Sequence, residues 1–369
     1  LADKGAEVIL YDGNEKLDAA AVANQTGARV ILGTFPEEEL ARLDLVVMSP
    51  GVPTDLPIVL RMKEEGIPVW GEIELAYVCG KGEILGITGT NGKTTTTSLL
   101  GEIMKNAFES VFVVGNIGNP YTTVANETRE DSVIVAELSS FQLESILTFR
   151  PKVSAVLNIT PDHLNRHHTM EAYIQAKQDI AKNQTSEDTC ILNYEDEVTR
   201  GMADKIDASV LFFSSAHKLE QGIYLDDGAI IYKPDKDKEG ILICRTEELQ
   251  ILGVHNYENV MAAVAMAAVY GVDLDVIRDT VKSFKGVEHR IEFVAEKGGV
   301  VYYNDSKGTN PDAAIKGIQA MNRPTVLIGG GYDKQSDFHE WIRSFDGKVR
   351  YLVLIGATKE QIQREAAEC

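Results

Sequence analysis

A run of small and hydroxyl residues around one lysine is the part of this sequence that points most directly to chemistry. The stretch GITGTNGKTTTT spans residues 86–97 and follows a short apolar segment. Backbone amides of residues 90–94 can form a concave anion site, and the helix expected next points its positive end at the same place. Lys93 would add a charge for the outer phosphates, and Thr94 a hydroxyl for magnesium. The stretch predicts a phosphate-binding loop.

The glycines of this loop differ from those of a strict Walker A sequence. Such a sequence has a glycine at the position that Ile87 occupies here, whereas this chain has Gly86 and Gly89 on either side. Gly89 and Gly92 allow backbone angles that other residues resist. The match is therefore to the Gly-Lys-Thr half, and a plain glycine turn before an exposed helix is the structural alternative.

Two polar side chains follow the next expected strands. Glu137 belongs to AELSSFQLE (136–144), which lies at the end of the strand DSVIV, and His163 follows the strand that ends in NIT. The carboxyl ends of parallel strands line the crevice in which open α/β sheets bind ligands. Glu137 is therefore a candidate magnesium ligand opposite the loop, and His163 can face the same crevice. A capping or solvated side chain is the ordinary alternative for each.

Other candidates lie on expected helices and turns. Lys177 lies on MEAYIQAKQDI, where charged side chains are normally solvated, and His167 and His168 in the preceding turn are expected at the surface. HNYEN (255–259) opens a helix, so its amides can be simple caps. YNDSKGTNPDAA (303–314) joins a strand to a helix, and an Asx turn with an N-cap is its plain interpretation.

The composition is that of an ordinary globular protein. The chain has 369 residues, of which 44% are hydrophobic and 25% charged, and its net charge is −20. This charge argues against a general nucleic-acid binder, and no apolar run approaches the roughly 18 residues that a membrane span needs. Four scattered cysteines fit a reducing cytosol better than a disulfide framework or a zinc site. We expect a cytoplasmic protein.

Short apolar strands alternate with helical stretches along the whole chain, which predicts three α/β units. We expect bounds of 1–80, 81–285 and 286–369, with a parallel, doubly wound sheet in the first unit. The expected strands are 7–12, 28–33, 43–53, 83–88, 111–116, 131–138, 152–160, 190–193, 209–213, 222–232, 290–296, 300–306, 324–331 and 350–356; the expected helices include 55–66, 169–184, 255–270 and 273–284.

The order Gly-Thr-Asn-Gly-Lys-Thr-Thr, the Glu137 and His163 stretches, the HNxxN helix start and NDSKGTN together resemble the Mur ligase superfamily. Its enzymes use ATP to convert a carboxylate into an acyl phosphate, which an amine then captures. NDSK-x-TN and LIGGGYDKQSDF (327–338) resemble the branch that adds D-glutamate to UDP-N-acetylmuramoyl-L-alanine in peptidoglycan precursor synthesis. The resemblance implies an N-terminal Rossmann-like UDP-binding domain, a central P-loop ATPase domain and a C-terminal Rossmann-like amino-acid-binding domain.

The resemblance also assigns roles to residues. It implies catalytic or metal-binding roles for Lys93, Thr94, Glu137, His163 and Lys177, with two magnesium sites and Lys177 carbamylated by carbon dioxide. ATP would be bound by Gly89, Thr90, Asn91, Gly92, Lys93, Thr94, Thr95, Asn256, Asn259, Arg290 and Asp305. The other substrates would be bound by Asp12, Ser49, Pro50, Gly51, Asn116, Ser139, Lys307, Thr309 and Lys334. A monomer is the family expectation.

Relative to this family, the diphosphate-holding glycine turn expected before Leu1 and a Ser-Pro-x-x-Ala-Ser segment expected after Cys369 are not in the sequence, so we expect both ends to be truncated. Three other functions stay open. Folylpolyglutamate synthase would need a folate pocket, against which SPGVP (49–53) argues. A P-loop switch or transport ATPase would not need NDSKGTN. A dinucleotide oxidoreductase would explain Asp12 but not Lys93.

Overall fold

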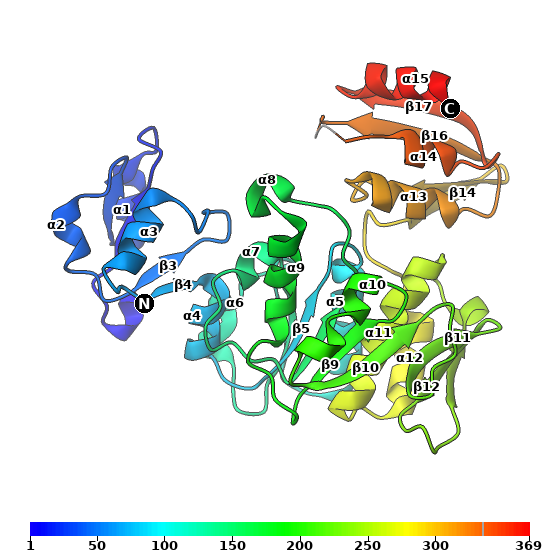
Figure 1. The fold of residues 1–369 in the computed structure, drawn as a ribbon, viewed down its shortest axis with the longest axis horizontal. Helices are drawn as coiled ribbons and strands as arrows, with labels where there is room; N and C mark the ends of the chain where they lie inside the picture. Colours follow the sequence, from blue (N-terminus) through cyan, green and yellow to red (C-terminus); the bar gives the residue numbers. More distant parts are fainter. Residues whose placement is uncertain (334–335) are drawn as a thin grey trace.

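The computed structural model describes residues 1–333 and 336–369, and these residues form three α/β units in series (Figure 1). The predicted fold class is confirmed. No helix in the described part of the chain is both long and apolar enough to cross a membrane.

The first unit is built from two separate pairs of parallel strands, β1 with β2 and β3 with β4. Its elements are β1 Ile9–Asp12, α1 Ala19–Thr26, β2 Arg29–Leu32, α2 Glu37–Leu40, β3 Val46–Met48, α3 Pro57–Glu64, β4 Val69–Gly71 and α4 Glu72–Cys79. The expectation of one continuous sheet is wrong for these residues, because β3 does not hydrogen-bond to the first pair. The strand expected at 43–53 also ends early, since Pro50 and Pro53 lack the N–H that a ladder needs.

The central unit is a nine-stranded sheet with the order β13-β12-β11-β10-β9-β8-β5-β7-β6. Its strands are β5 Glu83–Thr88, β6 Val111–Gly115, β7 Val133–Glu137, β8 Val153–Val156, β9 Thr189–Asn193, β10 Ser209–Ser214, β11 Gly222–Asp226, β12 Ala229–Lys233 and β13 Ile241–Arg245. The seven strands β5 to β11 run parallel, and β12 and β13 extend the sheet in antiparallel fashion. The hairpin within 222–232 and strand β13 were not predicted.

Helices cover both faces of the central sheet. They are α5 Lys93–Ala107, α6 Tyr121–Val124, α7 Ser140–Leu143, α8 Leu164–His167, α9 Met170–Gln178, α10 Glu197–Arg200, α11 Val254–Tyr270 and α12 Leu274–Ser283. Helices α5, α11 and α12 share one buried apolar core with the sheet, whereas α4, α6, α7 and α9 contribute to the core on the other face. Two-sided burial explains why the strands read as continuous apolar runs.

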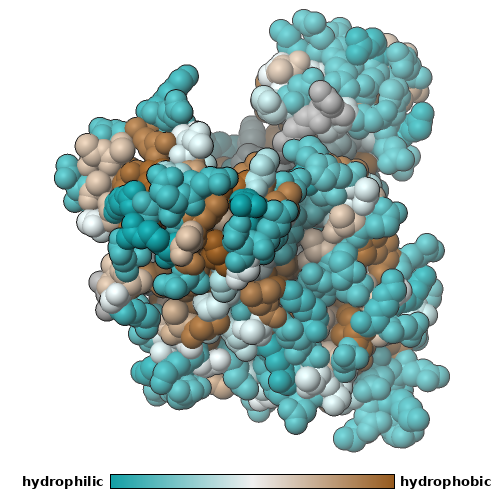
Figure 2. All heavy atoms as spheres, turned by 60° about the vertical axis from the view of Figure 1, so that its left-hand side comes forward, coloured by the Kyte–Doolittle hydropathy of each residue, from teal (hydrophilic) through white to brown (hydrophobic). Residues whose placement is uncertain are grey.

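The third unit pairs β14 with β15 in antiparallel fashion and β16 with β17 in parallel. Its elements are β14 Glu292–Lys297, β15 Val300–Asn304, α13 Pro311–Gln319, β16 Thr325–Gly331, α14 His339–Arg343, β17 Val349–Gly356 and α15 Lys359–Glu368. Trp341, Ile342 and Ile362 form its small core. Most of the visible surface of the molecule is hydrophilic, and it is hollowed between the first and third units (Figure 2).

Candidate active site

The loop after β5 is fixed by the strand next to it. The amides of Thr90 and Asn91 donate to the main-chain and side-chain oxygens of Asn158, at 2.9 and 2.8 Å. These two bonds use amides that we expected to face phosphate, so the free part of the nest begins at Gly92. Gly92 has φ of 87° and immediately precedes α5, whose first-turn amides point toward the loop. Asn158 was missed as a site residue, although its place at a strand end was visible in NIT.

Lys93 is folded back over the loop. Its Nζ donates to the carbonyl oxygens of Gly89 and Thr90, both at 2.9 Å. Burial lowers the pKa of Lys93, and the nearby Glu137 carboxylate partly offsets this effect. The ammonium is therefore held at the loop by carbonyls that a phosphate oxygen could replace as its partner.

Glu137 has one satisfied and one unsatisfied oxygen. Oε1 accepts from the Asn116 side chain at 2.9 Å, whereas Oε2 is buried and has no hydrogen-bond partner. The side chain is only 2% exposed. A buried carboxylate oxygen without a partner is costly unless a ligand completes it. Ser139 lies two residues beyond and caps α7 through a reciprocal bond pair with Gln142.

Lys177 is enclosed rather than solvated, unlike an ordinary lysine on a surface helix. It is 2% exposed, its Nζ donates to the Gly89 carbonyl at 2.7 Å, and it lies 4.9 Å from the centre of the Tyr173 ring. Burial, together with the charge of Lys93, lowers the pKa of Lys177 well below its usual value. The two lysines thus meet at one carbonyl oxygen, beside Glu137.

The histidines after β8 divide into two kinds. His163 is half-exposed, has φ of 53° and lies with its ring centre 4.9 Å from that of Phe141. His168 is exposed as expected. The expectation that His167 is a surface residue is wrong, because its ring packs against Phe141 and Tyr173 and is hydrogen-bonded to Ser140. Burial lowers the pKa of His167.

A small pocket of about 50 Å³ lies where the loop, the start of α11 and the third unit meet. Its lining includes the predicted residues Asn91, Gly92, Thr95, Asn256, Asn259, Arg290 and Asp305. Nε of Arg290 is buried without a partner, a second unsatisfied polar atom at this place. The Asn256 side chain donates to Leu252 O at 2.7 Å, and the N-cap of α11 is Gly253, so Asn256 is not the cap that we considered as the alternative.

The third unit touches the phosphate loop directly. Asn91 Nδ2 donates to Asp312 Oδ2 at 2.5 Å, and Lys316 is paired with the same carboxylate oxygen at 3.2 Å. Neither Asp312 nor Lys316 was among the predicted site residues.

The predicted substrate residues lie farther apart. Asn116 and Ser139 flank Glu137, and the turn with Ser49, Pro50 and Gly51 faces α8 across the boundary of the first unit. Asp12 is exposed and accepts from the amide of Asn14. Lys307 and Thr309 are exposed on the third unit. Lys334 lies outside the described residues.

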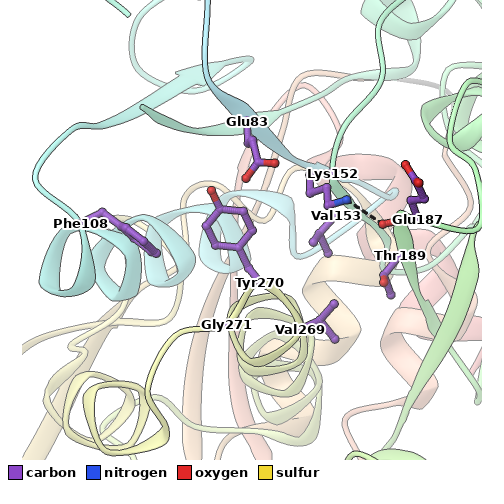
Figure 3. Close-up of a pocket in the computed structure, with 9 residues that line it drawn as sticks. All are labelled: Glu83, Phe108, Lys152, Val153, Glu187, Thr189, Val269, Tyr270 and Gly271. Atoms are coloured by element: carbon purple, nitrogen blue, oxygen red, sulfur yellow. Dashed lines mark hydrogen bonds between the residues drawn. The ribbon is translucent and has the colours of Figure 1, made fainter. Parts of the chain in front are cut away.

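A larger cavity of about 360 Å³ lies elsewhere, at the opposite ends of the parallel strands (Figure 3). It is bordered by Glu83 and Tyr270, and by Lys152, whose Nζ donates to Glu187 O at 2.7 Å. None of the predicted site residues lines it, so its size does not make it the reaction centre.

The residues fit one cation well. The unpaired Glu137 Oε2 supplies the hard oxygen ligand that magnesium prefers, and Thr94 stands beside Lys93 at the loop. A second site at Lys177 needs a chemical change, because an amine donor does not suit magnesium. The buried amine with its lowered pKa fits that change, since a neutral amine is the form that adds to carbon dioxide.

Comparison with known proteins finds matches to one family in all three units of the chain. Family models match at residues 1–71 (Mur ligase MurD-like, N-terminal domain), 87–267 (Mur ligase middle domain) and 289–369 (Mur ligase, glutamate ligase domain). The UDP-N-acetylmuramoylalanine–D-glutamate ligase of Lachnoclostridium phytofermentans is 58% identical over 99% of this chain and 81% of its own length. That of Clostridioides difficile is 50% identical over 97% and 80%.

Solved structures agree in fold. MurF of Acinetobacter baumannii superposes with a TM-score of 0.67 at 19% identity, covering 97% of this chain and 82% of that one. The UDP-N-acetylmuramate–alanine ligase MurC of Thermotoga maritima gives a TM-score of 0.60 at 21% identity, covering 100% and 84%. With three family models and relatives of this identity in agreement, the chain belongs to the Mur ligase family, in its MurD-like group.

Proposed function

We propose that this protein joins D-glutamate to UDP-N-acetylmuramoyl-L-alanine, converting ATP to ADP and phosphate by way of an acyl phosphate. The observation that carries the proposal is the cluster of Lys93, Lys177 and the unpaired Glu137 oxygen around the phosphate loop. Relatives whose printed name is that of this ligase are 46–58% identical over nearly the whole chain, and they support the choice of acceptor. ATP is the nucleotide of this family.

The chain's own residues act by positioning and by charge. Lys93 and the amides at the start of α5 hold the γ-phosphate, so that the carboxylate of the muramoyl-alanine substrate can attack phosphorus in line while ADP leaves. The D-glutamate amine then attacks the acyl carbon, inorganic phosphate leaves and the amine loses a proton. No side-chain nucleophile is required. Arg290 and Asp305 border the nucleotide from the third unit, and its closure would exclude water.

Metal binding is part of the proposal. Thr94 and Glu137 would hold one magnesium ion, and His163 with a carbamylated Lys177 a second. Bound magnesium would neutralise phosphate charge and screen the two anions from each other. The ring of Phe141 supports the position of His163. Asn116 fixes Glu137 through the bond to Oε1.

The remaining assignments are proposals of the same kind. Asn256 and Asn259 would lie beside the nucleotide, Asp12 and the Ser49 turn would bind the UDP part, and Lys307, Thr309 and Lys334 would face the acyl phosphate and D-glutamate. Domain bounds of 1–80, 81–285 and 286–369, a monomeric state and a cytoplasmic location stay predictions.

The Lys93→Ala variant tests the proposal. Removing the ammonium at the loop should lower ATP-dependent phosphate release by about a thousandfold, because charge stabilisation supplies most of the barrier reduction in phosphoryl transfer. Lys105→Ala is the control, since Lys105 is an exposed lysine in the last turn of the same helix. Equal activity of the two variants would refute the role of the loop.

A further inference from the structure

Helix α8 lies on the side of the central unit that faces the first unit (Figure 1), and it makes a polar contact with residues 51 and 52. Arg166, on this helix, donates from Nη2 to the carbonyl oxygen of Val52 at 2.9 Å and from Nη1 to that of Gly51 at 3.5 Å. Both carbonyls belong to the turn that includes Ser49 and Pro50. The Arg166 side chain is only 11% exposed.

The guanidinium is held by a chain of partners in the central unit, of which Glu144 is half-buried and His167 and Ser140 are buried. Arg166 Nη2 is paired with Glu144 Oε2 at 2.7 Å, and Glu144 Oε1 lies 3.1 Å from His167 Nδ1. A carboxylate only accepts, so His167 donates through Nδ1 and its Nε2 meets the hydroxyl of Ser140 at 2.9 Å. Ser140 is the first residue of α7, three residues after Glu137. The arginine also lies 5.0 Å from the centre of the Phe141 ring.

The first unit is otherwise tied to this face at a different place. Strand β4 runs directly into α4, which packs in the core of the central unit and whose Glu74 accepts from the amides of residues 147, 148 and 149. The amide of Gly71 donates to Ser145 O at 3.1 Å. Residues 1–71 are attached at this end of β4, and the strands before it can rotate about the attachment. Contact at a second point, the 51–52 turn, fixes that rotation. The exposed pair of His168 and Asp55, at 3.3 Å, adds little because it is screened by water.

We propose that Arg166 is a positioning residue: it fixes the substrate-binding turn of the first unit relative to Glu137, so that a substrate spanning both units is bound with its ends already at the right separation. This inference rests on the proposed function, in which the nucleotide end of the substrate lies in the first unit and its carboxylate lies near Glu137. Arg166 does not touch the reacting atoms. Its contribution is preorganisation of the two halves of one binding site.

The proposal predicts a difference between a short ligand and a long one. UDP alone occupies only the first unit, so the Arg166→Gln variant should bind it as the wild type does. UDP-N-acetylmuramoyl-L-alanine spans both units, and its Kd in calorimetry without ATP should rise about tenfold, the scale of one lost charge-assisted hydrogen bond. KM for ATP should stay within about twofold, since α5 and α11 are not involved. The Kd of Arg166→Lys for UDP-N-acetylmuramoyl-L-alanine should lie between those of the wild type and Arg166→Gln, because lysine keeps the charge but lacks the forked guanidinium.

Arg278→Gln is the matched control. Arg278 also bonds a carbonyl, that of Leu242, and a carboxylate, that of Asp275, but within the central unit. It should lose stability without changing either Kd. Equal weakening of UDP and the full substrate by Arg166→Gln, or no weakening of either, would overturn the proposal.

A ligand-free measurement separates this inference from the proposed function. Small-angle scattering of Arg166→Gln should give a larger radius of gyration than the wild type and Arg278→Gln, because the first unit is released. An unchanged radius of gyration would refute the proposal that Arg166 fixes the position of the first unit. If the wild type binds neither UDP ligand, the proposed function fails, and the scattering result alone then tests the positioning role of Arg166.

Discussion

Replacement of Gly92 by alanine tests the phosphate loop through a single methyl group. At φ of 87°, an L-residue costs about 1–2 kcal/mol relative to glycine. The added Cβ would also overlap Oδ1 of Asn259 and come within 3.1 Å of its Cγ. Asn259 is buried and bonds to Asn256 at 3.2 Å and to Thr96 at 3.4 Å, so its displacement forfeits about 1–2 kcal/mol more.

Gly271→Ala is the matched control for this variant. Gly271 ends α11 with φ of 98°, and a Cβ there would meet nothing within 4 Å. It therefore carries the backbone cost without the overlap. In urea unfolding followed by circular dichroism, Gly92→Ala should lose about 2–4 kcal/mol of the free energy of unfolding, and Gly271→Ala about 1–2 kcal/mol.

Nucleotide binding should separate the two variants further. Gly92 provides an amide of the free part of the nest and sets the position of Lys93, so Gly92→Ala should weaken ADP binding in calorimetry by about tenfold or more. Gly271→Ala should bind ADP as the wild type does. If the two variants are equally stable and bind ADP equally well, the geometry of the loop has been misread.

Three further outcomes follow from buried groups. Glu74 is 1% exposed and accepts from the amides of residues 147, 148 and 149, so Glu74→Gln should lower the free energy of unfolding by about 3 kcal/mol in the urea assay. The control Glu64→Gln, at an exposed position, should change it by less than about 0.5 kcal/mol. Equal losses in the two variants would contradict the value for Glu74. Burial lowers the pKa of His255 to about 4, below its unfolded value of about 6.5, so the unfolded chain binds the proton first and stability falls as pH drops through that window. After a discount for partial exposure, wild type should lose about 2 kcal/mol more than His255→Gln between pH 7.5 and 4.5, and parallel pH curves would refute this. Removal of carbon dioxide and bicarbonate should lower wild-type phosphate release by about tenfold and bicarbonate should restore it, with no such response in Lys177→Gln; wild-type activity indifferent to bicarbonate would exclude the carbamate.

The sequence predicts the parts of this protein that depend on local pattern. Period and composition locate β5, β7 and α11 to within a few residues, because buried strands and a helix with a continuous apolar face leave plain signals. The order of glycines around Lys93 predicts the loop, because few other backbones need those angles. The expectation that Glu137 stands at a strand end is met, since it is the last residue of β7.

Features that depend on contacts between distant segments were not predictable in this way. The burial of His167 follows from packing by Phe141 and Tyr173, which no local pattern reveals. Asn158 closes the loop from another strand, and Asp312 reaches Asn91 from more than 200 positions away. Such partners become visible only when the units are placed in space.

The most direct test of the central claim is phosphate release by the protein with ATP, magnesium and UDP-N-acetylmuramoyl-L-alanine, comparing D-glutamate, L-glutamate, L-lysine and diaminopimelate as acceptors. We expect release that depends on both the UDP substrate and D-glutamate, with one amide product formed for each phosphate. Release that needs neither substrate would contradict the account and leave a plain ATPase. Release with another acceptor would contradict the assigned specificity.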